Sequence, residues 1–156
     1  MTGALPVEIL GMTKRFGPLI ALDAVDLRVA AGSFHALLGE NGAGKSTLVK
    51  CLIGYHQPDA GSIVVAGRER EIRTPHDAHA LGLGMVYQHF TLVPSMTVAE
   101  NLVMARDDVP AMVRWREERE RLGAFMTKVP FRVDLDAPVA RLAAGEKQKV
   151  EILKQL

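Results

Sequence analysis

A glycine-rich stretch at residues 39–47 reads Gly-Glu-Asn-Gly-Ala-Gly-Lys-Ser-Thr and fits the spacing G-x-x-x-x-G-K-S/T at each fixed position. The apolar run Phe34–Leu38 before it predicts a buried parallel strand. After it, residues 47–53 place apolar side chains at helical spacing and stop at Gly54. A strand, a glycine-rich turn and a helix in this order predict a phosphate-binding loop. These flanking elements disfavour the alternative, a turn that carries Gly-Lys-Ser by chance.

Each residue type in this loop has a role in binding phosphate. Glycines let the backbone adopt positive φ values and approach a ligand closely, so that successive N–H groups form an anion-binding nest. The helix that opens near Gly44 adds unpaired N–H groups and the positive end of its dipole. Lys45 brings a compact charge to the terminal phosphates, and the Ser46 hydroxyl is placed to bind a magnesium ion that bridges them.

The whole chain excludes several classes of protein. Its 156 residues suffice for one domain with a core, and its 19 Lys and Arg against 18 Asp and Glu argue against a nucleic-acid partner held by a basic surface. A single cysteine, Cys51, excludes an internal disulfide and suits a reducing compartment as a small buried residue. Glu8 and Lys14 interrupt any signal-peptide core, so we expect an intracellular protein that acts on a membrane only through a partner.

The remaining pattern of the first 95 residues predicts short strands around this loop. We expect an edge strand at Val7–Leu10, a strand with a polar outer face at Ile20–Ala30, and a third at Ser62–Gly67. Gly84–Tyr87 predicts a buried strand with Gln88 at its carboxyl end, where an open α/β sheet faces its ligand. From composition alone, Phe16 is expected to fill the core under a turn. Stacking on a flat base is the alternative.

The later part of the chain predicts helices. Thr97-Val98-Ala99-Glu100 forms a capping box that starts a helix, and an amphipathic helix with a charged, solvated face follows over 111–129. An i, i+4 pair between Glu117 and Arg121 is expected on that face. The apolar loop around Phe90 fits a docking surface and a cover for the core equally well. A last helix runs to Leu156 without a C-cap signal, which predicts that the sequence is part of a longer one.

In combination, these stretches resemble the nucleotide-binding domain of ATP-binding cassette (ABC) transporters over nearly the whole chain. The resemblance implies that Phe16 stacks on adenine, which reverses the interpretation from composition. It identifies Gln88 as the Q-loop glutamine, which contacts Mg²⁺ and couples to the membrane subunit. It also implies that the Walker A loop binds ATP through Gly39, Asn41, Gly42, Ala43, Gly44, Lys45, Ser46 and Thr47. The family's signature segment, which closes over ATP bound to another subunit, matches Leu142, Ala143, Ala144, Gly145 and Glu146.

Details of the sequence are most similar to importers of nucleosides or simple sugars. They are the stretch from His89 to Asn101, Glu146 in place of the commoner glutamine, and Val150–Lys154 after it. Those ATPases usually carry two cassettes in tandem, so the chain would be part of the first. The resemblance also implies transmembrane permease subunits, a second nucleotide-binding domain and, indirectly, a solute-binding protein as partners, with no nucleic acid. It implies a peripheral location on the cytoplasmic face of the cell membrane.

Two departures from the family pattern bear on activity. Ala143 stands where the family has a serine whose hydroxyl reaches the γ-phosphate, so one composite ATP site is expected to be weak or silent. The family also needs an apolar strand that ends in Asp-Glu, the Walker B motif, and the 156 residues contain none. In the family that strand follows the signature helix, beyond Leu156. We therefore expect nucleotide contacts here but no hydrolysis by these residues alone.

The sequence thus predicts an α/β protein with a P-loop NTPase (RecA-like) core, an antiparallel β edge and an inserted helical subdomain, incomplete at its C-terminus. Residues 1–95 are expected to form the core with Walker A and the Q-loop, and residues 96–156 the helical subdomain with the signature. The expected function is Mg-ATP binding that drives import. The alternatives are a non-hydrolytic ATP-dependent clamp and a soluble cassette ATPase of translation or DNA repair; a small-molecule P-loop kinase fits least well.

Overall fold

The computed structural model describes residues 5–106, 108–109 and 112–156. The chain divides into two compact units, Met1–Gly84 and Met85–Leu156. Strands occur in the first unit and most of the helical residues in the second, in line with the predicted α/β class. The functional division that the sequence suggests between residues 95 and 96 stays a prediction.

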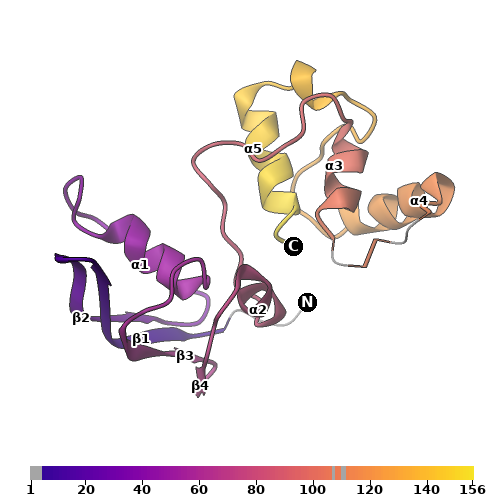
Figure 1. Ribbon diagram of the computed structural model, residues 1–156. Helices are drawn as coiled ribbons and strands as arrows, with labels where there is room; N and C mark the ends of the chain where they lie inside the picture. Colours follow the sequence, from indigo (N-terminus) through magenta and orange to yellow (C-terminus); the bar gives the residue numbers. More distant parts are fainter. Residues whose placement is uncertain (1–4, 107, 110–111) are drawn as a thin grey trace. The chain divides into compact units, whose positions relative to one another are not determined.

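The first unit is built on a four-stranded antiparallel sheet (Figure 1). Its order is β2-β1-β3-β4, so β1 is a central strand and its predicted position at a sheet edge is wrong. The backbone of β1 pairs with β2 along one side and with β3 along the other, and weak alternation over four residues does not reveal such pairing. The four strands are β1 (Val7–Phe16), β2 (Leu19–Val29), β3 (Ala60–Val65) and β4 (Arg68–Arg70).

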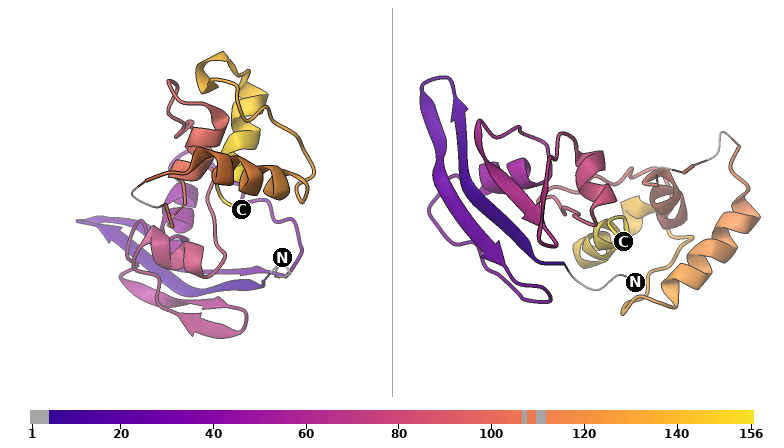
Figure 2. Two further views of the ribbon diagram at one scale, coloured as in Figure 1. Left: turned by 90° about the vertical axis from the view of Figure 1, so that its right-hand side faces the viewer. Right: turned by 90° about the horizontal axis from the view of Figure 1, so that it is seen from below.

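Two helices complete this unit. Helix α1 (Lys45–Leu52) lies over one face of the sheet (Figures 1 and 2), where it buries Leu48 and Cys51. Helix α2 (Pro75–Ala80) begins after Thr74, whose hydroxyl accepts a hydrogen bond from the Asp77 N–H. The fully or nearly buried apolar residues of the unit are Ile9, Met12, Leu22, Leu48, Cys51, Ile53, Ile63, Val65, Ile72 and Ala78.

Two predicted strands do not form. Residues 34–38 and 84–87 are irregular, Phe34 is 98% exposed, and Leu38 and Val86 are also exposed. A buried parallel strand needs hydrogen-bonded neighbours and cover on both faces. In the described parts of the chain, the only sheet is the antiparallel one of β1 to β4, which pairs with neither segment.

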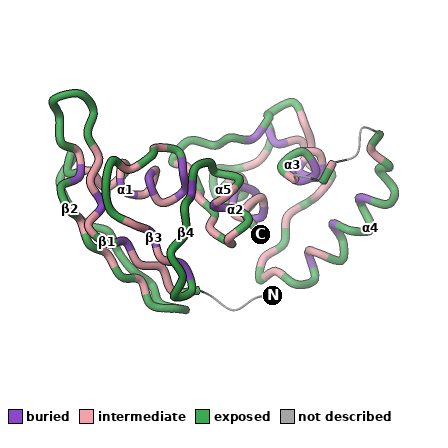
Figure 3. The backbone as a smooth tube through the Cα atoms, turned by 60° about the horizontal axis from the view of Figure 1, so that its bottom comes forward, coloured by how far each residue is buried: buried purple, intermediate pink, exposed green. Residues whose placement is uncertain are grey.

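The second unit is helical and has its own core. It contains α3 (Val98–Met104), α4 (Trp115–Met126), a 3₁₀ turn at Val139–Arg141 and α5 (Ala144–Leu153). The predicted capping box at the start of α3 is confirmed, because Thr97 and Glu100 each accept the other's backbone N–H. Along α4, buried positions recur about once a turn among exposed ones (Figure 3). The core consists of Leu92, Val98, Ala99, Leu102, Val103, Leu122, Met126, Val139, Val150 and Leu153.

Three helix ends differ from the prediction, and one of them is the C-terminal end of α4, which lies at Met126 instead of residue 129. Helix α4 begins at Trp115, where Glu117 and Glu118 in its first turn complement the positive end of the helix dipole. The predicted start at residue 111 lies outside the described residues. Helix α5 ends at Leu153 instead of continuing to Leu156, since Lys154 and Gln155 form a turn.

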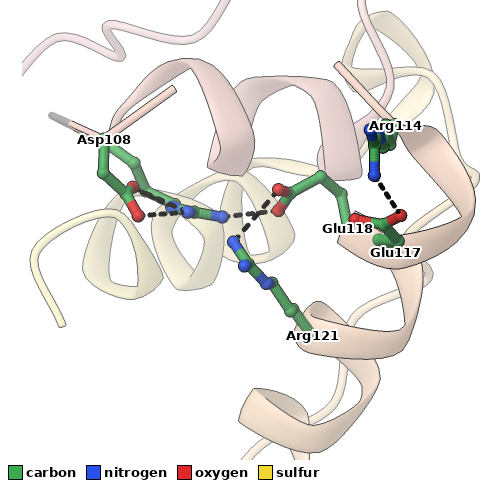
Figure 4. Close-up of polar contacts among 6 residues, drawn as sticks. Asp108, Arg114, Glu117, Glu118 and Arg121 are labelled. Atoms are coloured by element: carbon green, nitrogen blue, oxygen red, sulfur yellow. Dashed lines mark hydrogen bonds and ion pairs between the residues drawn. The ribbon is translucent and has the colours of Figure 1, made fainter. Parts of the chain in front are cut away.

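One residue of α4 is an exception to the expected face of mostly solvated charges. The Glu118 side chain is only 5% exposed, and its carboxylate accepts from Arg106 at 2.5 Å and from Arg121 at 3.3 Å (Figure 4). The expected pair between Glu117 and Arg121 does not form, because Arg121 turns toward Glu118 and Glu117 pairs with Arg114. This cluster links α4 to the chain just after α3.

We predict that Glu118→Ala lowers the free energy of unfolding by about 1–3 kcal/mol, because two arginines lose a buried acceptor. Both arginines keep access to water, which holds the cost below that of a fully enclosed pair. Equilibrium urea unfolding measures the difference. Glu117→Ala removes an exposed carboxylate one position earlier and should change stability by less than about 0.5 kcal/mol. Equal effects of the two variants would contradict the role of the cluster.

Asp59 ties the turn after α1 to the end of β1. Its carboxylate accepts the Arg15 backbone N–H at 2.6 Å and lies 3.3 Å from the Lys14 ammonium. The Asp59 N–H in turn donates to the Thr13 carbonyl at 2.8 Å. The hydrogen bond from the Arg15 N–H, followed by that from Lys14, holds the pKa of Asp59 below its usual value.

A carboxylate with a lowered pKa in the folded state stabilises the protein above its pKa in the unfolded chain, about 3.9, and loses that contribution as pH falls through the folded value. We therefore expect Asp59→Asn to be less stable than the wild type at pH 7, with a difference that shrinks progressively below about pH 4. Unfolding curves from pH 7 to pH 2 measure this. A difference that stays constant over the range would show that the charge of Asp59 contributes nothing.

Candidate functional site

The glycine-rich loop wraps around the side chain of Lys45. The Lys45 ammonium donates to the carbonyl oxygens of Gly39 at 2.6 Å and Glu40 at 2.7 Å. The Ala43 N–H donates to the same Glu40 carbonyl at 3.2 Å and closes a turn. The loop is therefore a compact ring that holds one cation at the start of α1.

Gly44 connects this ring to the helix and requires the absence of a side chain. It is the N-cap of α1 in the left-handed region, with φ of 83°, and a Cβ atom there would lie 2.5 Å from the Ala21 carbonyl oxygen. The start of α1 therefore lies directly on β2. The first intrahelical bond runs from the Leu48 N–H to the Gly44 carbonyl, which leaves the N–H groups of the first turn without a helical acceptor.

The other residues predicted to contact phosphate lie in the same loop or in the first turn of α1. Asn41, Gly42 and Ala43 are exposed in the loop, Ser46 is exposed in the first turn, and Thr47 beside it is half-buried. Unpaired N–H groups, a lysine ammonium and an accessible hydroxyl thus lie together at the positive end of a helix. This arrangement suits an anion with several oxygens.

Phe16 lies at the end of the β1–β2 hairpin and does not plug the core, because it is 42% exposed. It pairs with Leu19, two residues before the Ala21 carbonyl that contacts Gly44. The aromatic ring and the start of α1 therefore meet the same end of β2. The His56 ring packs edge-on against Phe16, with centroids 5.3 Å apart, and the Lys14 ammonium lies 5.5 Å from the Phe16 centroid.

Cys51 has no accessible thiol. The residue is fully buried on the inner face of α1, and burial raises the pKa of its thiol. A neutral thiol packed in a core acts as a small apolar side chain. This agrees with the expectation of a buried, unreactive cysteine.

Gln88 lies in the second unit, four positions after the boundary at Gly84. It is exposed in a bend at residues 88–89, within a segment of irregular backbone. We refer to residues 85–93 as the Gln88 segment. Within it, Phe90 and Val93 are more than 40% exposed while Leu92 is buried, so the segment both covers the core and presents an apolar surface.

The predicted signature segment forms the start of α5. Ala143 is the N-cap residue, and its N–H donates to the Glu146 carboxylate at 2.9 Å. Leu142 is half-buried, whereas Ala144, Gly145 and Glu146 are exposed. Sequence reasoning did not identify the capping role of position 143. The spacing of a capping box was the available signal, but alanine replaces the hydroxyl residue that would have completed it.

Sequence reasoning also missed the polar contacts of the later part of α5 and of the turn after it. Glu151 is almost fully buried and binds Thr91 of the Gln88 segment. Lys154 donates to the Thr91 hydroxyl at 2.7 Å, and Gln155 accepts the Met85 N–H at 3.2 Å. The only signal for this was a charged residue within an apolar helical run. None of the helices in the described residues has the length and apolarity to cross a membrane.

Comparison with known proteins gives import ATP-binding proteins among the relatives. Ribose import ATP-binding protein RbsA of Burkholderia mallei is 45% identical over 152 residues, covering 96% of this chain and 30% of that protein. Guanosine import ATP-binding protein NupO of Bacillus subtilis is 42% identical over 154 residues, with 96% and 30% covered. The chain thus spans about 30% of the length of the curated relatives it matches.

Solved structures agree in fold. A nucleotide-free ATP-binding cassette from an ABC transporter superposes with a TM-score of 0.76 at 23% identity, over 97% of this chain and 64% of that one. The ADP conformation of MJ1267, another such cassette, gives a TM-score of 0.74 at 24% identity, over 99% and 65%. A family model described as ABC transporter matches residues 22–156. The predicted cassette fold is thereby confirmed, and the chain belongs to the ABC transporter family.

Proposed function

We propose that this chain is the ATP-binding part of an ABC importer of the nucleoside or simple-sugar class. The observation that carries the proposal is the ring of loop backbone around Lys45 at the N-terminus of α1. The names of the relatives, which are import ATP-binding proteins for ribose and guanosine, support the substrate class. Phosphate, base and partner are bound by different parts of the chain.

The phosphate tail of ATP would bind the Walker A loop. The Lys45 ammonium would supply the charge, and the N–H groups of the first turn of α1 would donate to the phosphate oxygens. Phe16 would stack on the adenine, since its exposed ring and the start of α1 meet the same end of β2. The residues we assign to ATP are Phe16, Gly39, Asn41, Gly42, Ala43, Gly44, Lys45, Ser46 and Thr47.

The residues present also suit magnesium, which prefers oxygen ligands. The Ser46 hydroxyl and the Gln88 side-chain carbonyl would hold the ion, and both residues are exposed. The ion would neutralise phosphate charge. Gln88 would then link the metal to the permease side of the complex, because it lies beside the apolar surface of Phe90 and Val93.

The start of α5 would contact ATP held by a second cassette. Leu142, Ala143, Ala144, Gly145 and Glu146 form this segment, and all of them except Leu142 are exposed at a helix N-terminus. Ala143 lacks a hydroxyl, so this side of the composite site binds phosphate less well than a serine-containing one. Transmembrane permeases are the other direct partners, with a solute-binding protein acting through them, at the cytoplasmic face of the membrane.

Hydrolysis would need carboxylates that these 156 residues do not supply, since no apolar run in them ends in Asp-Glu. We assign the chain to ATP binding and the catalytic carboxylates to further residues of the intact protein. The second candidate is a non-hydrolytic clamp, which the alanine at position 143 favours. ATP turnover by the intact protein distinguishes the two, because a clamp binds ATP tightly without turnover.

Lys45→Ala should weaken ATP binding by the intact protein by about 10-fold to 100-fold, since it removes a charge-assisted hydrogen bond of about 1.5–3 kcal/mol. Isothermal titration calorimetry with a non-hydrolysable ATP analogue and Mg²⁺ measures this. Lys50→Ala is the matched control, because Lys50 lies in the last turn of the same helix. An unchanged affinity in Lys45→Ala would overturn the assignment of the loop to phosphate.

Ala143→Ser should act in two ways. As an N-cap, the hydroxyl would accept an N–H of the first turn of α5 and raise the free energy of unfolding by about 0.5–2 kcal/mol without nucleotide. As a donor to phosphate, it would tighten ATP-dependent association of the cassettes by about 10-fold or more. Urea unfolding and analytical ultracentrifugation measure the two effects. Ala124→Ser, within α4, should produce neither, and a stabilised Ala143→Ser protein with unchanged association would contradict the phosphate contact.

A further inference from the structure

The Gln88 segment is held by side chains instead of a backbone ladder. Within the second unit, the backbone groups of residues 86–92 form no hydrogen bond with the backbone of another described residue. At one end, the Met85 N–H donates to the Gln155 side chain. Near the other end, Asn101 of α3 accepts the Val93 N–H at 2.7 Å and donates to the Val93 carbonyl at 3.1 Å. The conformation of the segment therefore depends on these anchors.

Glu151 of α5 provides a further anchor. Its side chain is 1% exposed. The carboxylate accepts the Thr91 backbone N–H, and the Thr91 hydroxyl lies 3.0 and 3.1 Å from its two oxygens. Lys154 donates to the same hydroxyl and lies 3.6 Å from the carboxylate. A buried carboxylate needs all of these partners, because an unpaired charge in the interior is strongly unfavourable. If Thr91 left α5, the buried Glu151 carboxylate would lose its hydrogen bonds to the Thr91 N–H and hydroxyl.

These anchors bracket Gln88. Met85 and Thr91 each lie three positions from it. Thr91 is bound by Glu151 in the C-terminal half of α5, and Met85 by Gln155 in the turn that follows this helix. The N-terminal end of the same helix carries the signature segment, about 10 Å away along the axis from Ala144 to Glu151. One rigid helix thus presents Ala144 and Gly145 at one end and fixes the Gln88 segment at the other.

We propose that Glu151, together with Thr91, Lys154 and Gln155, is a set of positioning residues that makes the Gln88 segment move as one body with the signature segment. The inference rests on the proposed function, because it gives Gln88 and the signature their roles in ATP binding. Contact of the signature with ATP on a second cassette would then be transmitted through α5 to Gln88. In this role Glu151 acts through the backbone N–H and the hydroxyl of Thr91, both of which it binds directly.

The test compares two buried glutamates of the same unit in the intact protein. Glu151→Gln removes the charge that binds Thr91 and Lys154, whereas Glu118→Gln removes one that binds Arg106 and Arg121. Hydrogen–deuterium exchange reports on residues 85–93, and steady-state kinetics separates kcat from the KM for ATP. In Glu151→Gln, exchange in residues 85–93 should rise by about 10-fold and kcat should fall by about 10-fold, with KM within about 2-fold of the wild type.

In Glu118→Gln, by contrast, exchange should rise in α3 and α4 and not in residues 85–93. The positioning role is overturned if Glu151→Gln leaves exchange in residues 85–93 or kcat unchanged. It is also overturned if Glu151→Gln raises exchange throughout the unit instead of in residues 85–93. A general loss of structure would lower the melting temperature and raise exchange throughout the unit. Comparison of the two variants detects this.

A second pair of variants keeps the test decisive if Glu151→Gln does not fold. Thr91→Ser retains the hydroxyl and should behave as the wild type, whereas Thr91→Val keeps the shape and loses the hydroxyl. Only Thr91→Val should show faster exchange in residues 85–93 and a lower kcat; identical kinetics for the two variants overturn the proposal. Failure of the proposed function would appear separately, as unchanged ATP affinity in Lys45→Ala, and would leave the exchange results intact.

Discussion

The contact between Gly44 and the Ala21 carbonyl determines where the first helix begins. Because Gly44 has no side chain, the backbone can turn with positive φ against β2 and enter α1 at once. The helix then buries Leu48 and Cys51 on the sheet, while its first N–H groups face away from any helical acceptor. The same geometry supplies the anchor of the unit and the donors of its phosphate site. A side chain at position 44 would damage both.

Local features of this fold could be predicted from the sequence. The helix starts at Thr74 and Thr97 follow from side chains that satisfy N–H groups within three residues. The loop before α1 follows from the fixed spacing of its glycines and Lys45. In each case the partners are neighbours along the chain, so the pattern contains all the information. The family resemblance implies that Phe16 stacks on a base, which agrees with its exposure at the end of a hairpin. Composition alone suggested a core residue.

Features that depend on distant partners could not be predicted in this way. The runs at 34–38 and 84–87 have the composition of buried strands, but composition does not say whether a neighbouring strand is present. In the sequence, Glu118 is one of many charged residues on a helix and nothing nearby distinguishes it. Its burial depends on Arg106, which is 12 residues away. Glu151 reads as an interruption of an apolar run, and its partner Thr91 is 60 residues away. Pairing over such separations leaves no local pattern.

The two units hold their polar groups in place in different ways. In the first, backbone geometry orients N–H groups, and a single lysine supplies the charge. In the second, buried carboxylates on helices fix segments that have no regular structure of their own. A segment that is hydrogen-bonded into a sheet opens together with that sheet. A segment that is held by side chains of a helix moves with that helix. Because Glu151 lies on α5 and Gln155 lies in the turn directly after it, displacement of this helix need not break the anchors at Thr91 and Met85. Because the backbone of the Gln88 segment is irregular, the segment can move together with a helix that lies about 60 residues later in the chain.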